Sequence, residues 1–242
     1  MKISRKKIFL LIQIFVLSIS LQAQTGDYIS AKQHTEILEN RNKLTTEVDL
    51  FLDNNKQILT KYYHSSPDFV IVSNALGEIK TYFPAKNEVD YRQINEMSSK
   101  RNLIYYFANN ITDNLGLVDD GFTLESNSFE DQYYVTIWKS PSILTGIENV
   151  KMVFENGSPI YSEYKAVDKD KILKKIYYTN YQDFVRFRLP MKIIEISYKP
   201  TGDSIISRTI FSDVKVSSSA NNSYFDFKIP DDAKPITTSE SK

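Results

Sequence analysis

Few residues of this chain could carry out chemistry. Among its 242 residues there is no cysteine, and the only histidines, His34 and His64, are 30 positions apart. A catalytic histidine needs a positioned partner and a proton within hydrogen-bond reach. The sequence shows no recognisable partner for either histidine, so we expect both to be packed or solvated side chains.

The adjacent acids Asp119-Asp120 and Asp231-Asp232 are poor candidates for a catalytic carboxylate pair. Neighbours in an extended chain point to opposite sides, so we interpret these acids as turn or surface residues. With only 7 glycines, the chain has no Gly-rich phosphate loop. The residues therefore predict no catalytic group, no metal site and no cofactor, and a protein that is not an enzyme.

The elements that would position any site begin after a predicted signal peptide, residues 1–23. A basic start precedes an apolar run, residues 8–19, and the small residue Ala23. This run is shorter than the roughly 20 residues that cross a bilayer, which favours cleavage over a permanent anchor. Without these residues 26 basic side chains face 30 acidic ones, a net charge of −4. Nothing indicates nucleic-acid binding, and export predicts a periplasmic protein.

The remaining chain is typical of a sheet protein. Aromatic residues make up 13 % of it, and such side chains suit a pleated, half-buried surface. Val48, Leu50 and Leu52 alternate with acids, as in a strand with one wet face. Without a repeat or a linker, we expect one domain over residues 24–236, mainly β with about ten to eleven strands, and a disordered tail, residues 237–242.

Turn signals separate the predicted strands. The segment 74–77 ends in Gly77, which can take a positive φ, and Pro84 ends the strand 79–83 because it cannot donate to a ladder. Asn156-Gly157 lies between alternating runs and predicts a tight hairpin. Another hairpin is expected at residues 201–203.

Two segments depart from the strand period. Residues 30–42 carry His34, Ile37, Leu38 and Arg41 at helical spacing, so we predict an N-terminal helix there. Between residues 98 and 117, apolar side chains recur every four residues, which predicts an amphipathic helix or two short helices that break near Asn109-Asn110. This insert is either a plug in a closed core or a lid over an apolar trough for a lipid-like ligand.

The order of these pieces resembles the LolA/LolB-type outer-membrane lipoprotein carriers over residues 28–236. The matching features are an export signal, a strand meander with Pro67, a helical insert and two short motifs. The first motif comprises Asn74, Gly77, Tyr82, Phe83, Pro84, Asn87 and Val89. The second is the ending FDFKIPDDA, with Phe225, Phe227, Ile229, Pro230 and Ala233.

The resemblance implies an incomplete antiparallel β-barrel whose concave apolar side holds acyl chains under a helical lid. It implies a periplasmic carrier of lipoproteins, with an inner-membrane release complex and an outer-membrane acceptor as partners. The absence of a lipid-attachment cysteine favours a soluble shuttle. Where the family commonly has a basic residue before the first strand proline, this chain has Ser65-Ser66, and it has an extra hairpin at residues 191–211. The cargo is therefore left as a lipoprotein or another lipid.

Alternation along each strand gives the candidate ligand-binding residues. For the apolar cavity these are Val48, Leu50, Leu52, Val70, Val72, Val135, Ile137, Met152, Phe154, Phe225 and Phe227, and for the lid they are Leu103, Ile104, Phe107 and Ile111. A register error of one residue would move any strand residue to the opposite face. The alternatives are a non-catalytic interaction module of a surface assembly and a hydrolase whose site is not recognisable.

Overall fold

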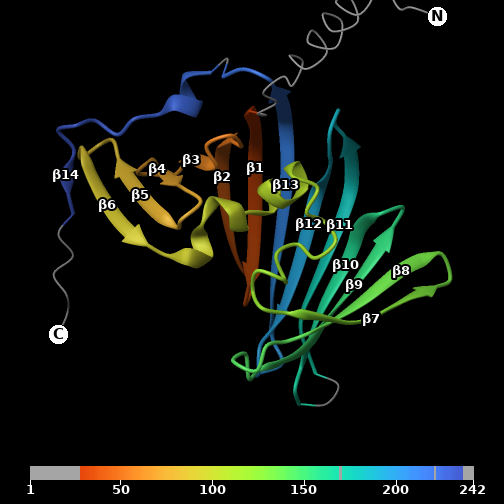
Figure 1. Ribbon diagram of the computed structural model, residues 1–242. Coiled ribbons are helices and arrows are strands. Elements are labelled where there is room, and N and C mark those ends of the chain that lie inside the picture. Colours follow the sequence, from red (N-terminus) through yellow and green to blue (C-terminus); the bar gives the residue numbers. More distant parts are fainter. Residues whose placement is uncertain (1–27, 169–170, 221, 237–242) are drawn as a thin grey trace, which may run out of the picture.

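The structure is a computed structural model that describes residues 28–168, 171–220 and 222–236. Within these residues one 14-stranded sheet has the order β14-β6-β5-β4-β3-β2-β1-β13-β12-β11-β10-β9-β8-β7. The sheet curves around the segment between β6 and β7, and its two ends do not pair (Figure 1). The predicted mainly β, incomplete antiparallel barrel is confirmed. The predicted signal peptide and disordered tail lie outside the described residues.

The first half of the sheet is a meander of six strands in chain order. Their bounds are β1 (Tyr28–Glu39), β2 (Asn42–Asp53), β3 (Ile58–Tyr63), β4 (Phe69–Ser73), β5 (Glu78–Phe83) and β6 (Glu88–Gln93). A helical segment follows, with two 3₁₀ turns, η1 (Asn95–Met97) and η2 (Ser99–Arg101), and the short helix α2 (Leu103–Ala108).

The second half returns as a second meander that joins the first where β13 pairs with β1. Its strands are β7 (Thr123–Glu130), β8 (Tyr133–Lys139), β9 (Ile147–Glu155), β10 (Ser158–Ala166), β11 (Ile172–Asp183), β12 (Arg188–Tyr198) and β13 (Ser204–Ser217). The chain then forms η3 (Ser223–Asp226) and the two-residue strand β14 (Lys234–Pro235), which runs parallel to β6.

The predicted N-terminal helix is wrong, because residues 28–39 form β1, a central strand paired with both β2 and β13. The same residues also alternate, with Ile29 and Ala31 buried on one face. Asn40 and Arg41 both have positive φ values, 49° and 67°, and turn the chain directly into β2. A two-residue turn of this kind favours a hairpin, and pairing on two sides overrides a weak local helical preference.

The helical insert is much shorter than predicted. Only Leu103–Ala108 is α-helical, and the described residues up to β7 are otherwise turns. The Asn102 side chain accepts a hydrogen bond from the Ile104 amide at 3.0 Å and begins the helix. Asn110, with φ of 55°, ends it in the left-handed conformation. The predicted break near Asn109-Asn110 is confirmed, whereas a second helix after it is not found in the described chain.

The strand count also exceeds the prediction, since 14 strands replace ten or eleven. The sequence interpretation missed β1 and β7, whereas the predicted turns at residues 74–77, 156–157 and 201–203 are all present. The aromatic ending predicted as a strand is instead η3 followed by extended chain. In Figure 1 this ending leaves β13 and crosses to the far edge, where β14 lies beside β6.

The main core lies between α2 and the face of the sheet that carries it, called the inner face below. Ile104 and Phe107 are 0 % and 1 % exposed and pack with inner-face residues such as Leu50 and Leu189. A second cluster, around Trp138, Val150 and Met152, lies under the turns that follow α2. The opposite face of the sheet is called the outer face.

Candidate functional site

An apolar hollow lies at the β7 end of the sheet. It has a volume of about 650 Å³ and is called the β7–β9 pocket. Its lining residues come from the turn after α2, the β7–β8 hairpin, β9 and the β9–β10 turn: Asn110, Thr112, Asp113, Leu124, Phe129, Gln132, Tyr134, Thr136, Trp138, Phe154, Asn156 and Gly157. This volume is typical of ligand sites in proteins, which span roughly 300–1,000 Å³.

The floor of the β7–β9 pocket is aromatic. Trp138 and Phe154 are buried, and the Tyr134 ring lies 5.9 Å from the Phe154 ring. The Trp138 indole N–H donates to Thr136 Oγ1 at 2.9 Å, so its polar atom is satisfied within the protein. The floor therefore presents mainly carbon surface, which suits an apolar ligand better than a polar one.

The mouth of the pocket exposes apolar side chains to water. Phe129 is 77 % exposed and Leu124 is 48 % exposed, and both come from the edge strand β7. Polar residues surround them, among them Asn110, Thr112 and Gln132. Exposed apolar groups with a polar rim are the surface pattern of a binding site rather than of a closed core.

The turns that follow α2 form one wall of the pocket and are held firmly in place. Asn109 and Asn54 exchange two side-chain hydrogen bonds, of 3.0 and 3.1 Å, which join the end of α2 to the β2–β3 turn. The Asn110 side chain donates to the Arg186 carbonyl at 3.0 Å, on the β11–β12 loop. The wall is thus tied to two separate parts of the sheet.

The predicted lid residues face the sheet, but they do not cover this pocket. Ile104 and Phe107 lie in the main core, where the Phe107 ring is 6.2 Å from the rings of both Tyr178 and Tyr181. Leu103 and Ile111 are half-buried at the border of the same core. In this structure α2 is packed in the main core, and the β7–β9 pocket lies beside it.

The predicted cavity residues divide into three groups. Val48, Leu50 and Leu52 are on the inner face, within the closed core beneath α2. Phe154 lines the β7–β9 pocket, and Met152 is buried next to it in the same cluster. The third group, on the outer face, consists of Val70, Val72, Val135, Ile137, Phe225 and Phe227.

Strand register explains why Val135 and Ile137 do not share a face with Phe154. Val135 is opposite Val153, whereas Phe154 is opposite Tyr134. Directly opposite residues of antiparallel strands point to the same face. The lining residues of β8 are therefore Tyr134, Thr136 and Trp138, and the choice of the two aliphatic residues was wrong by one position.

Val70, Phe225 and Phe227 belong to an aromatic cluster on the outer face. Val70 is paired with Tyr62 and Tyr82. The Phe225 ring packs 5.4 Å from Phe51, and the Phe227 ring packs 5.4 Å from Tyr62. Phe225 and Phe227 thus fasten the C-terminal segment to the back of the sheet, and the expectation that they line an inner cavity is wrong.

Sequence reasoning missed Leu124, Phe129 and the other residues of β7. All eight residues of this strand are exposed, so it lacks the buried and exposed alternation that reveals most strands. One usable signal was the Asp131-Gln132 pair before β8, where Asp131 takes a φ of 53° and turns the hairpin.

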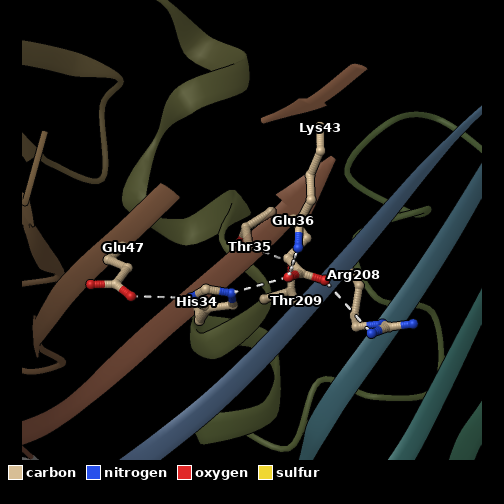
Figure 2. A network of polar contacts seen from close by, with 7 residues as sticks. All are labelled: His34, Thr35, Glu36, Lys43, Glu47, Arg208 and Thr209. Atoms are coloured by element: carbon tan, nitrogen blue, oxygen red, sulfur yellow. Dashed lines mark hydrogen bonds and ion pairs between the residues drawn. The ribbon is translucent and has the colours of Figure 1, made fainter. Parts of the chain in front are cut away.

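Both histidines have carboxylate partners, contrary to the expectation from sequence. His34 Nδ1 lies 3.3 Å from Glu47 Oε1, and His64 Nε2 lies 2.9 Å from Asp49 Oδ2. Figure 2 shows His34 within a polar network in which Glu36 also meets Lys43 and Arg208. These ion pairs bridge β1, β2 and β13 on the outer face.

The network carries no sign of a catalytic or metal centre. Within residues 28–168, 171–220 and 222–236, no hydroxyl group hydrogen-bonds to either imidazole. The same ranges contain no group of three or more His, Asp or Glu side chains that could hold a metal ion. A cation lowers the pKa of Glu36, since Lys43 hydrogen-bonds to its carboxylate, as expected for a surface ion pair.

No protein-family model and no curated protein matches the chain. Solved structures do match. A LolA superfamily protein from Nitrosomonas europaea is 14 % identical with a TM-score of 0.51, over 79 % of this chain and 86 % of that chain. A putative outer membrane lipoprotein-sorting protein domain from Vibrio parahaemolyticus is 13 % identical with a TM-score of 0.52, over 88 % and 94 %. The chain has a LolA-like fold.

A third similar structure extends this result. A DUF1329 family protein from Desulfovibrio piger is 12 % identical with a TM-score of 0.52, over 88 % of this chain and 93 % of that chain. The matched region thus covers most of each of these three proteins. In the part of the chain that the structure describes, no helix is long and apolar enough to cross a bilayer.

Proposed function

We propose that this chain is a periplasmic carrier that holds an acyl chain, of a lipoprotein or another lipid, in the β7–β9 pocket. The observation that carries the proposal is this apolar pocket of about 650 Å³ with exposed Phe129 and Leu124 at its mouth. The LolA-like fold, seen also in a lipoprotein-sorting domain, supports the same ligand class. Such a carrier needs no catalytic residue, because it binds and releases without chemistry.

Physical chemistry explains why such a ligand needs a carrier. Burying a methylene group gains about 0.8 kcal/mol, so an acyl chain of about sixteen carbons left in water costs on the order of 12 kcal/mol. A useful carrier offsets most of this cost, but it must bind the acyl chain less tightly than the membrane does, so that the chain can be released. A pocket that is open at one side, with aromatic residues on its floor, suits that balance better than a sealed cavity.

Export and delivery complete the proposal. The predicted signal peptide at residues 1–23 would place the mature chain in the periplasm. An inner-membrane complex that releases the lipid and an outer-membrane acceptor would then be its partners, as the resemblance to the lipoprotein carriers implies.

The test is the binding of a fluorescent fatty acid to delipidated protein. We expect saturable binding by the parent, weakened at least tenfold in Leu124→Glu and Phe129→Glu, because a carboxylate at the mouth would lose hydration against the acyl chain. Both positions are exposed, so both variants should fold. Glutamate at Leu50 or Phe107 would instead place a charge in the closed core and unfold the protein.

Ile143→Glu is the matched control. Ile143 is 84 % exposed, on the β8–β9 loop, and does not line the pocket. This variant should bind like the parent. If the parent binds no probe, across several acyl lengths and lipopeptides, the carrier function is refuted and the interaction module becomes the better hypothesis.

A further inference from the structure

Lys61 is an unusual residue for the inner face of this sheet. It lies in β3 between Leu50 of β2 and Ile71 of β4, its direct partners in register. Leu50 is fully buried in the main core, so the Lys61 side chain leaves the strand beside apolar packing. Lysine is rarely placed in such surroundings unless its charge is paired.

Lys61 has no such pairing. Within residues 28–168, 171–220 and 222–236, its ammonium group forms neither a hydrogen bond nor an ion pair. Neighbouring charges differ in this respect, because Lys174 pairs with Glu195 at 3.1 Å and Arg101 pairs with Asp120 at 2.6 Å. Burial lowers the pKa of Lys61, since removal from water disfavours the charged form.

Two hollows meet at this side chain. One, of about 200 Å³, lies between β3–β5 and η1, and the other, of about 300 Å³, lies between β12–β13 and the start of α2. Lys61, Arg101 and Asn102 line both of them. The acidic groups at their borders are Glu96 in the first and Glu195 in the second. Glu195 pairs with Lys174 at 3.1 Å, and within the described residues neither Glu195 nor Glu96 forms an ion pair with Lys61.

We infer that Lys61 binds the acidic head group, a carboxylate or a phosphate, of the acyl ligand. This inference rests on the proposed carrier function and narrows it to anionic amphiphiles. The first hollow is smaller than a typical ligand pocket and the second is at the lower limit of that range. The polar side chains of Arg101 and Asn102 line both, which suits a head group better than an acyl chain. An anion beside the ammonium offsets its desolvation and restores its charge.

The head-group position and the β7–β9 pocket lie at opposite ends of α2. Asn102 precedes the helix and lines the hollows around Lys61, whereas Asn110 follows the helix and lines the pocket. Six helical residues rise by about 9 Å, which is short beside an extended acyl chain of sixteen carbons. The chain of one amphiphile is therefore long enough to span the distance between the two ends of α2.

The experiment compares a fluorescent sixteen-carbon fatty acid with its methyl ester, which keeps the chain and removes the charge. The parent should bind the acid at least tenfold more tightly than the ester at low ionic strength. In Lys61→Met the two probes should bind within about threefold of each other. Lys80→Met is the matched control, because Lys80 is exposed on the outer face in β5, which β4 separates from β3, and this variant should behave like the parent.

Stability separates a binding effect from misfolding. Removal of a desolvated charge should leave the melting temperature of Lys61→Met unchanged or raised. The comparison of acid and ester in the parent needs no substitution, so it tests the inference even if the variant unfolds.

The remaining outcomes are distinct. Equal binding of acid and ester by the parent overturns the head-group inference and leaves the carrier function standing. If inorganic phosphate binds the parent and not Lys61→Met while acid and ester bind alike, the site takes a free ion and the lipid head group is refuted. If neither probe binds, the carrier function fails, and the head-group inference fails with it.

Discussion

At the scale of single residues, the outer-face network shows that a histidine close to a carboxylate is not by itself evidence of a catalytic site. His34 and His64 each lie within 3.3 Å of a carboxylate oxygen, yet both side chains are substantially exposed. Exposed ion pairs of this kind contribute about 0–1 kcal/mol to folding. A catalytic base also needs a nucleophile or a substrate proton within reach, and no described hydroxyl group bonds either ring.

The corresponding prediction concerns the double variant His34→Gln, His64→Gln. Acyl binding should stay within a few-fold of the parent, and the free energy of unfolding should change by less than about 1 kcal/mol, because only surface ion pairs are lost. Fatty-acid titration and urea unfolding measure the two quantities. A loss of function of a thousandfold or more, the size expected when a catalytic group is removed, would instead revive the hydrolase hypothesis.

At the scale of elements, α2 decides how much of the inner face is open. A helix of 6 residues is too short to be stable alone in water, so its conformation depends on caps and on packing. Asn102 caps its start, and the Asn54–Asn109 amide pair holds its end against the β2–β3 turn. Ile104 and Phe107 fill the centre of the sheet and confine the apolar space to the β7 end.

We predict that Phe107→Ala lowers the free energy of unfolding by about 3–5 kcal/mol, the cost of deleting a buried aromatic side chain. Leu103→Ala, at the half-buried start of the helix, should cost clearly less. Urea unfolding measures both, and fatty-acid binding below the unfolding transition should remain near the parent value. Unchanged stability together with altered binding would show that α2 is a movable lid rather than a plug.

At the scale of the whole molecule, one curved sheet supplies two different surfaces. The inner face carries both apolar clusters and the pocket, and the outer face carries ion pairs and the aromatic cluster under the C-terminal segment. Tyrosines are part of the packing on both faces. Burial is the first cause that raises the pKa of Tyr62, Tyr161, Tyr164, Tyr178 and Tyr181.

This shared burial predicts cooperative alkaline unfolding. Burial raises the pKa of Tyr164 to about 12 from its ordinary value of 10.0, so the folded state holds its proton more tightly than the unfolded state. That contribution to stability is complete below pH 10 and is lost as the pH rises towards about 12. Tyrosinate absorbance and circular dichroism should therefore change together in this interval. Ionisation of all 16 tyrosines near pH 10 with intact secondary structure would contradict the prediction.

The sequence by itself determined the features that depend on neighbouring residues. Asn156-Gly157 and the segment ending at Gly77 are turns because their residues accept positive φ, with values of 49°, 76° and 81° in the structure. Pro84 ends β5 because it lacks an amide proton. The aromatic and alternating composition indicated a sheet, and the ordered set of motifs indicated a carrier-like fold.

Only the tertiary structure decided which face of each strand points to the inside of the sheet and where the apolar pocket lies. Apolar residues in the segment 30–42 have helical spacing, yet β1 forms there. Pairing with β2 and β13 satisfies the backbone hydrogen-bonding groups of β1 on both sides. Val135 was preferred over Tyr134 on local pattern, yet the register with β9 reverses that choice. A strand has a period of two, so its pattern identifies two faces without saying which one is inside. Contacts between residues far apart in the chain make that decision, and with it they fix the position of the pocket.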